Sequence, residues 1–323
     1  MALHERWFLD DSKFPVQFGT WSSPHSLIPI AVAVGITLVA TIIFRARGRH
    51  SVIPGPIAFG MPWENYVRLL TWVPLVIGVH TGVTLLVSGV NRELFIPNLV
   101  LPVNLLGGVL GMIEIAIALA FIYGALARPA AAALGLTWII GAVVFGPWRL
   151  LEHTEILGIA FFLYATGRGP LAFDMALEKL HRPVRALIPY AVPVLRVSLG
   201  IGLVLVALSE KIWNIPMGLA FLAEHNFNFF PYIGMPGIDD TKFVLIAGAV
   251  ELIVGMMLIA GTYVRLVIIV TLIPFNLTLP FLGWQELVGH LPTYGILALL
   301  LLWGDERPGE RGALVRALLG ARA

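Results

Sequence analysis

The chain has 323 residues, of which 58% are hydrophobic and only 12% are charged. Soluble domains usually carry about 25% charged residues, so this composition excludes an ordinary soluble fold. The net charge of +2 and the lack of a basic stripe with interleaved aromatic residues argue against nucleic acid as a partner. Because the chain has no cysteine, redox chemistry would need a bound cofactor, a metal held by His and Glu, or a partner chain.

Long apolar runs separated by short polar breaks predict an all-α, polytopic protein with about nine transmembrane helices in a lipid bilayer. In chain order we expect helices at residues 27–44, 66–89, 105–126, 129–147, 154–167, 187–208, 243–262, 265–283 and 291–304. The fifth and ninth are only about 14 residues long, which is short for a bilayer crossing. Each is therefore either part of a longer tilted helix or a segment that does not cross fully.

Basic residues predict the orientation of these helices. The cluster Arg45, Arg47, Arg49 and His50 directly follows the first helix and is expected on the cytoplasmic side, which leaves the N-terminus outside. With this orientation, 15 of the 21 Lys and Arg residues lie on the inner side and 6 on the outer side. Residues 1–26 do not have the pattern of a cleaved signal. We therefore expect a multi-pass protein of the bacterial inner membrane with a cytoplasmic C-terminus.

The sequence contains an internal repeat, because residues 111–167 match the residues 137 positions later without a gap. Matches between charged residues are the most informative, since apolar and glycine matches are common in this composition. They pair Glu114, Arg128 and His153 with Glu251, Arg265 and His290. Upstream, and less cleanly, Arg68 and Arg196 pair as the starts of two further helices.

The repeat predicts four parts of the chain. Residues 1–60 form an outer N-terminal segment, the first helix and a basic cytoplasmic loop, and residues 307–323 form a basic cytoplasmic tail. Between them lie two tandem four-helix repeats, at residues 61–180 and 181–306. Both repeats enter the membrane from the cytoplasm, so they are parallel, unlike the inverted repeats of many secondary transporters.

Ionisable residues inside the predicted helices are the candidate site, because a charge in the middle of a span costs roughly 2.5–3.5 kcal/mol. Glu114 and Glu251 each precede the cytoplasmic arginine of their own helix by 14 residues, a height of about 21 Å. His80 and Glu210 lie about 18 and 21 Å along their helices. These heights converge on the outer half of the bilayer.

We expect Glu114, Glu251, Glu210 and Lys211 to act as catalytic groups, and a binding site to include His80, His153, His290, Arg149, Glu155 and Glu286. The alternative is that these side chains only hydrogen-bond neighbouring helices and fix their packing. A metal is a weaker possibility, with His80, Glu114, His153 and Glu155 as N and O ligands suited to iron, copper or zinc. Their spacing fits no specific metal motif.

Two predicted outer loops, 91–104 and 212–240, are long and apolar, and the second is rich in aromatic residues. One interpretation is a belt of aromatic side chains at the membrane interface. The other is a lid over a cavity that opens on the outer side.

Parts of both repeats resemble the DoxX/DoxD family of membrane proteins. The helix with Gly248, Glu251, Gly261 and Arg265 is similar to the central helix of that family. The segment 153–174 resembles its closing segment, and residues 196–211 resemble its opening helix. The resemblance covers about residues 64–304 as two units and implies one four-helix bundle in each.

The resemblance also implies a function. Members of that family include the membrane subunit of thiosulfate:quinone oxidoreductase and proteins that partner redox enzymes. By this resemblance, Glu114, Glu251, Lys211, His153 and His290 would line the functional cavity. This chain differs from a single-unit member because the unit is doubled, and its first repeat lacks a lysine matching Lys211.

We therefore expect a membrane subunit of a quinone-linked redox system that binds quinone or a small substrate, and has a redox-enzyme or periplasmic partner subunit. Whether the chain itself is an enzyme stays open, as does the identity of its cofactor. The alternatives are a non-enzymatic carrier or scaffold for a hydrophobic ligand or partner protein, and a transporter of small solutes.

Overall fold

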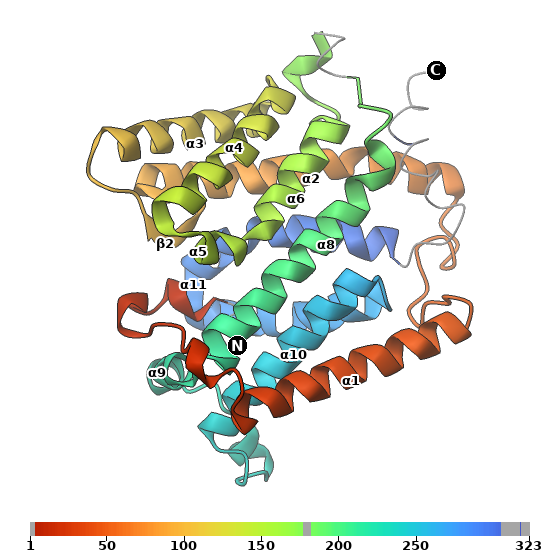
Figure 1. Ribbon diagram of the computed structural model, residues 1–323. Helices are drawn as coiled ribbons and strands as arrows, with labels where there is room; N and C mark the ends of the chain where they lie inside the picture. The colour runs from red at the N-terminus through yellow and green to blue at the C-terminus, as the bar shows by residue number, and fades with distance from the viewer. Residues whose placement is uncertain (1–3, 177–181, 305–316, 318–323) are drawn as a thin grey trace.

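The computed structural model describes residues 4–176, 182–304 and Ala317, which are largely helical (Figure 1). Seven helices are long and apolar enough to cross a membrane, which confirms a multi-pass helical protein. They are α1 (Pro24–Ala46), α2 (Trp63–Asn91), α3 (Leu105–Tyr123), α4 (Ala127–Phe145), α8 with its extension (Ile188–Ile212), α10 (Asp240–Ala260) and α11 (Val264–Trp303). Apart from Ala317, the expected tail 307–323 lies outside the described residues.

Shorter elements connect these helices. The apolar helix α6 is Thr154–Thr166, and α5 is Pro147–Leu151. Between α2 and α3, strands β1 (Glu93–Leu94) and β2 (Ile96–Val100) form a small antiparallel pair. The remaining short elements are η1 (Glu5–Trp7), η2 (Asp11–Lys13), η3 (Phe18–Thr20), η4 (Phe173–Ala176), α9 (Ile215–His225) and η6 (Phe230–Ile233).

Helix ends follow from local sequence signals that recur in the two halves of the chain. The Asn104 side chain accepts a hydrogen bond from the Gly107 N–H at the start of α3, and Asp239 accepts one from the Lys242 N–H at the start of α10. Both helices then end at a glycine with positive φ, Gly124 at 67° and Gly261 at 66°. A residue with a Cβ is strained in this conformation, which explains the two matched glycines.

The last expected pair of helices differs from the prediction. We expected a turn at 284–290 and a short ninth helix, but the chain is helical on both sides of a single break at Gly283, where φ is 69° and ψ is −145°. Helix therefore resumes at residue 284 and continues to Trp303, so this segment is not short. The fifth expected helix is short, as α6 spans only Thr154–Thr166.

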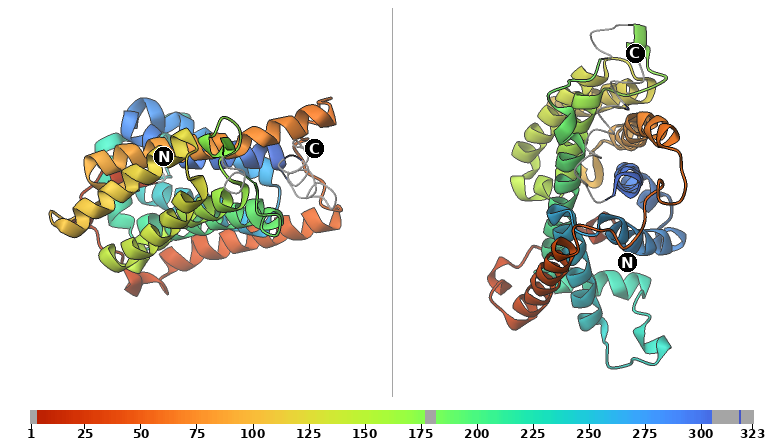
Figure 2. Two further views of the ribbon diagram at one scale, coloured as in Figure 1. Left: turned by 90° about the horizontal axis from the view of Figure 1, so that it is seen from above. Right: turned by 90° about the vertical axis from the view of Figure 1, so that its right-hand side faces the viewer.

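The helices pack in an order that joins the two halves at two places (Figures 1 and 2). Within the halves, α2 packs on α3, α3 on α4, α4 on α6, and α8 on α10. Between the halves, α6 packs against α8, and α11 packs against α2. Helix α1 lies along α10 at one side of the molecule, and many of its apolar side chains are exposed. The surface of α1 thus suits contact with lipid.

Close helix contacts correct our alignment of the upstream helices. A side chain at Gly82 would meet the Ala118 carbonyl oxygen at 2.9 Å, and one at Gly200 would meet the Gly255 carbonyl oxygen at 2.7 Å. Ala118 and Gly255 are 137 residues apart, as in the repeat, so Gly82 corresponds to Gly200. That is an offset of 118 residues rather than the 128 between Arg68 and Arg196. The pairing of the two arginines is therefore wrong.

Candidate functional site

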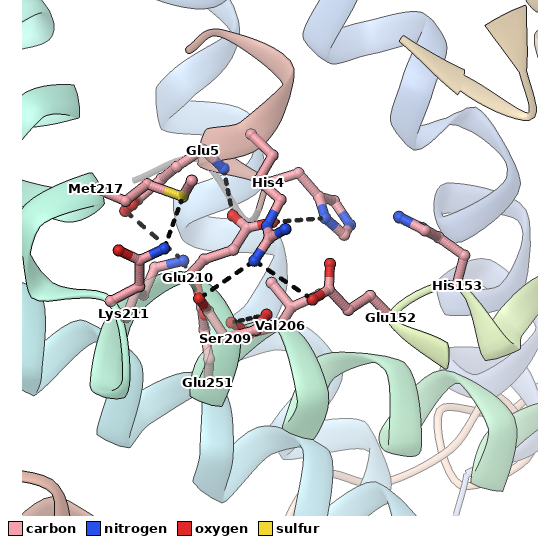
Figure 3. A network of polar contacts seen from close by, with 12 residues as sticks. His4, Glu5, Glu152, His153, Val206, Ser209, Glu210, Lys211, Met217 and Glu251 are labelled. Carbon is pink, nitrogen blue, oxygen red and sulfur yellow. Dashed lines mark hydrogen bonds and ion pairs between the residues drawn. The ribbon is translucent and has the colours of Figure 1, made fainter. Parts of the chain in front are cut away.

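The N-terminal segment is buried between the two halves of the chain, a position that sequence reasoning did not predict. Glu5, Arg6 and Trp7 are only 1%, 6% and 7% exposed. The Glu5 N–H donates to Glu210 Oε2 at 2.6 Å (Figure 3). The Gln285 side chain donates to the Trp7 carbonyl at 2.6 Å. These contacts attach η1 to both α11 and the extension of α8.

That extension is η5 (Ala207–Ile212), a π-helical turn that continues directly from α8 (Ile188–Val206). Such turns shift the direction of the following side chains and are frequent at functional sites. Here the turn carries Ser209, Glu210 and Lys211, and the side chains of all three are buried. Two of the expected catalytic residues therefore owe their positions to this irregular turn.

Lys211 lies between two carboxylates from different elements. Its Nζ is 3.1 Å from Glu251 Oε2 on α10 and 3.8 Å from Glu5 Oε1 in the N-terminal segment. The Lys211 side chain is completely buried, and a buried ammonium needs such partners to offset the loss of water. The structure thus brings together Lys211 and Glu251, both expected in the site, and adds Glu5.

A second group surrounds Arg6. Its Nε is 3.6 Å from Glu210 Oε1, and its Nη2 is 3.7 Å from Glu152 Oε1. Glu152 follows α5 directly, so Arg6 joins the N-terminal segment to both halves of the chain. The two groups contain four buried carboxylates, from Glu5, Glu152, Glu210 and Glu251, but only two permanent cations, Arg6 and Lys211.

Burial shifts the pKa values of ionisable groups in this cluster. Loss of solvent raises the pKa of Glu5 to about 8, although Lys211 opposes the shift. Loss of solvent also raises the pKa of Glu152 to about 7, with Arg6 opposing it. The pKa of His4 falls to about 4 because burial disfavours its charged form. The cluster therefore contains carboxyl groups that hold protons near neutral pH.

Three imidazole rings meet at this cluster. The His4 ring centroid is 5.0 Å from that of His153 and 5.6 Å from that of His290. His153 Nδ1 is 3.3 Å from Glu155 Oε1, whereas His290 Nδ1 is 2.9 Å from the Glu286 backbone carbonyl. His153 and His290 occupy equivalent positions in the repeat, and His4 lies within ring-contact distance of both.

Other expected site residues have different surroundings. Glu114 accepts a hydrogen bond from the Phe95 N–H at 2.7 Å and so holds the β1–β2 hairpin. His80 Nδ1 is 3.1 Å from the Leu291 carbonyl, which is a contact between α2 and α11. Arg149 lies on α5, one turn before Glu152. Among the described residues, no three His, Asp or Glu side chains gather as a metal site, so the suggested metal ligands do not form one.

An apolar cavity of about 620 Å³ lies next to Glu251. It is bounded by α10, by the part of α11 before Gly283 and by the loop after α9. Its aromatic walls come from Phe227, Phe229, Phe230, Tyr232, Phe275 and Phe281. Part of the aromatic loop 212–240 therefore lines this cavity, which is the position that the lid interpretation requires.

No protein-family model matches this chain, and no curated protein or solved structure matches it. The function is therefore argued from the geometry of the cluster and the cavity.

Proposed function

We propose that this chain is the membrane subunit of a quinone-linked redox system and binds a quinone in the apolar cavity beside Glu251. The observation that carries the proposal is a cavity of about 620 Å³ with aromatic walls and a carboxyl group held by a buried lysine. This volume is typical of small-molecule sites, which combine apolar walls with a few polar groups. A quinone ring would stack among the aromatic side chains, and its oxygen would face Glu251.

The chemistry of a quinone requires a proton donor and a proton acceptor, and a carboxyl group can serve as either. Reduction adds two electrons and two protons to the two ring oxygens, and oxidation of the quinol releases them. A protonated Glu251 donates a hydrogen bond to a quinone oxygen, whereas its carboxylate accepts the proton of a quinol hydroxyl. Lys211 at 3.1 Å stabilises the carboxylate after the proton has left. The electrons would pass to or from a redox-enzyme partner on the outer side.

We also propose that the chain forms two DoxX-like four-helix units after an additional first helix, nine spans in all. Equivalent close helix contacts support this arrangement. Gly82 lies against the Ala118 carbonyl of α3 and Gly200 lies against the Gly255 carbonyl of α10, and these two carbonyls are 137 residues apart. The distribution of Lys and Arg, 15 inside and 6 outside, supports a bacterial inner-membrane protein with its N-terminus outside.

A carrier of a hydrophobic ligand is the second candidate, and the apolar character of the cavity favours it as well. A carrier would use the same walls and the same carboxyl group to hold a polar head group. It would differ in having no change of redox state and no partner enzyme. The test below therefore identifies the bound molecule as well as measuring its affinity.

The test begins with native mass spectrometry of the protein purified gently from its own membranes, with quinone analysis of the same sample. Binding of decylubiquinone is then titrated by calorimetry in lipid nanodiscs. We expect a stoichiometric quinone. Val250→Trp places an indole in the cavity and should weaken binding at least about tenfold, because steric overlap of this kind costs about 1–3 kcal/mol. Glu251→Gln removes the proton acceptor and tests its role.

Ile42→Trp is the matched control, because Ile42 lies on α1 and is 65% exposed. Its affinity should equal that of the wild type. Wild-type protein that contains no quinone and does not bind decylubiquinone would refute the proposal. A bound apolar molecule without redox activity would establish the carrier instead.

A further inference from the structure

Two small cavities lie beside His4. Each has a volume of about 10 Å³, which is just enough for one water molecule. His4, Glu155 and His290 line both. The second cavity shares Leu203 and Phe275 with the large apolar cavity, so the two are separated by a single layer of side chains.

Polar atoms near these cavities are arranged for exchange with water. His290 Nε2 is buried without a hydrogen-bond partner among the described residues. His4 Nδ1 is 3.7 Å from Glu210 Oε1, beyond direct hydrogen-bonding distance but within reach of a bridging water or a small side-chain movement. Both imidazoles therefore line spaces of water size, and each has a buried ring nitrogen without a hydrogen-bond partner among the described residues.

The acidic side chains of the cluster extend from these imidazoles toward the large apolar cavity. The Glu5 backbone is bound to Glu210, and the Glu5 side chain faces Lys211, which faces Glu251. The charges of Glu210 and Glu251 both contribute to the raised pKa of Glu5, so the three carboxyl groups interact electrostatically. A proton added to one of them therefore changes the proton affinity of the others.

We propose that His4 relays protons between the acids next to the apolar cavity and the histidines His153 and His290 of the two halves. A carboxyl group gives its proton to one imidazole nitrogen, and the other nitrogen releases a proton to the water or imidazole beyond it. The reverse step restores the starting state, and no electron moves. The relay rests on the proposed function only in that the molecule in the apolar cavity is taken to be a quinone.

His4 is suited to this relay by its chemistry and position. Because burial lowers the pKa of His4 to about 4, the ring is neutral near pH 7 and has one N–H donor and one acceptor nitrogen. It stacks on Trp7 with ring centroids 4.5 Å apart, which fixes its orientation. The groups that face it are Glu210 from η5, His153 from the start of α6, and His290 from α11.

The relay is tested by infrared spectroscopy of hydrogen–deuterium exchange at the buried carboxylic acids, in nanodiscs without added quinone. At a pH of about 6.5, Glu5 and Glu152 are expected to hold protons, since their pKa values are about 8 and about 7. We expect His4→Phe, which keeps a ring on Trp7 but has no nitrogen, to slow this exchange at least about tenfold. His50→Phe, at an exposed histidine, is the control.

Chemical rescue separates proton relay from a purely structural role. His4→Ala should also exchange slowly, and added imidazole should restore the wild-type rate by occupying the vacated space. Exchange at the wild-type rate in both variants would overturn the relay, and so would slow exchange that imidazole does not restore. If exchange depends on His4 while decylubiquinone does not bind, the relay stands and the proposed quinone function fails.

Discussion

Replacement of Lys211 by methionine tests the energetic role of the buried cluster. The Nζ atom lies 3.1 Å from Glu251 and 3.8 Å from Glu5. With an effective dielectric constant of about 20, the attraction to the Glu251 carboxylate is about 5 kcal/mol, and that to Glu5 is about 4 kcal/mol when Glu5 is ionised, above its pKa of about 8. Desolvation of the ammonium group offsets several kcal/mol of this sum. Methionine removes the attraction and leaves two buried acids without their cation.

We therefore expect Lys211→Met to reduce the free energy of unfolding by about 3–5 kcal/mol, the usual cost of removing one partner of a buried ion pair. The assay is unfolding in mixed micelles of increasing SDS content, followed by tryptophan fluorescence. The double variant Lys211→Met/Glu251→Gln should regain at least about half of the loss, because a neutral amide no longer needs a cation. Lys242→Met is the matched control, at an exposed ion pair with Asp239.

Two results would refute this reasoning. The first is a loss of unfolding free energy of only about 0.6 kcal/mol, the average for polar contacts between helices in membranes. It would mean that Lys211 does not offset the charge of the buried acids. The second is a double variant that is no more stable than Lys211→Met, because it would mean that Glu251 does not cause the loss of stability.

Three further predictions concern packing and pH. Gly200→Leu should force α8 away from the Gly255 carbonyl and lower stability by about 1–3 kcal/mol in the same assay, whereas Gly35→Leu, with no atom within 4 Å, should not. Trp7→Ala should cost about 3 kcal/mol, and the exposed Trp21→Ala almost nothing; equal losses would contradict the burial of the N-terminal segment. Between pH about 6.5 and 8 the folded chain binds more protons at Glu5 than the unfolded chain, because its pKa is raised from 4.5 to about 8, so stability should fall as pH rises. Thermal unfolding across this range should show a flatter profile in Glu5→Gln but not in the exposed Glu64→Gln, and an unchanged slope in Glu5→Gln would contradict it.

Helix positions could be predicted from the sequence because the bilayer requires long apolar segments of nearly fixed length. The repeat was also visible, since charged residues are rare inside spans. The alignment of the upstream helices of the two repeats was harder to predict. Arg68 and Arg196 mark where helices meet the membrane surface, but the approach of Gly82 and Gly200 to neighbouring carbonyls sets the packing. Because α2 is the longer helix, these two criteria give different alignments.

The site was only partly predictable. Lys211 and Glu251 are charged residues in apolar helices, and this made them candidates before their contact was known. His4, Glu5 and Arg6 lie in a polar segment before the first helix, where exposure is the ordinary expectation. Their partners are about two hundred residues away in the chain, such as Glu210 for Glu5, and no local pattern indicates so distant a contact. Glu210 was a candidate as a charged residue in an apolar helix, whereas Glu5 gave no signal of its own.

The burial of the N-terminal segment has a consequence for assembly in the cell. Residues 4–7 are made long before their contact partners, which lie near residues 152, 210 and 285. The segment can therefore take its place between the two halves only after these residues have been made. Docking of this segment would be the final step of folding, and it would occur only when both halves are in place.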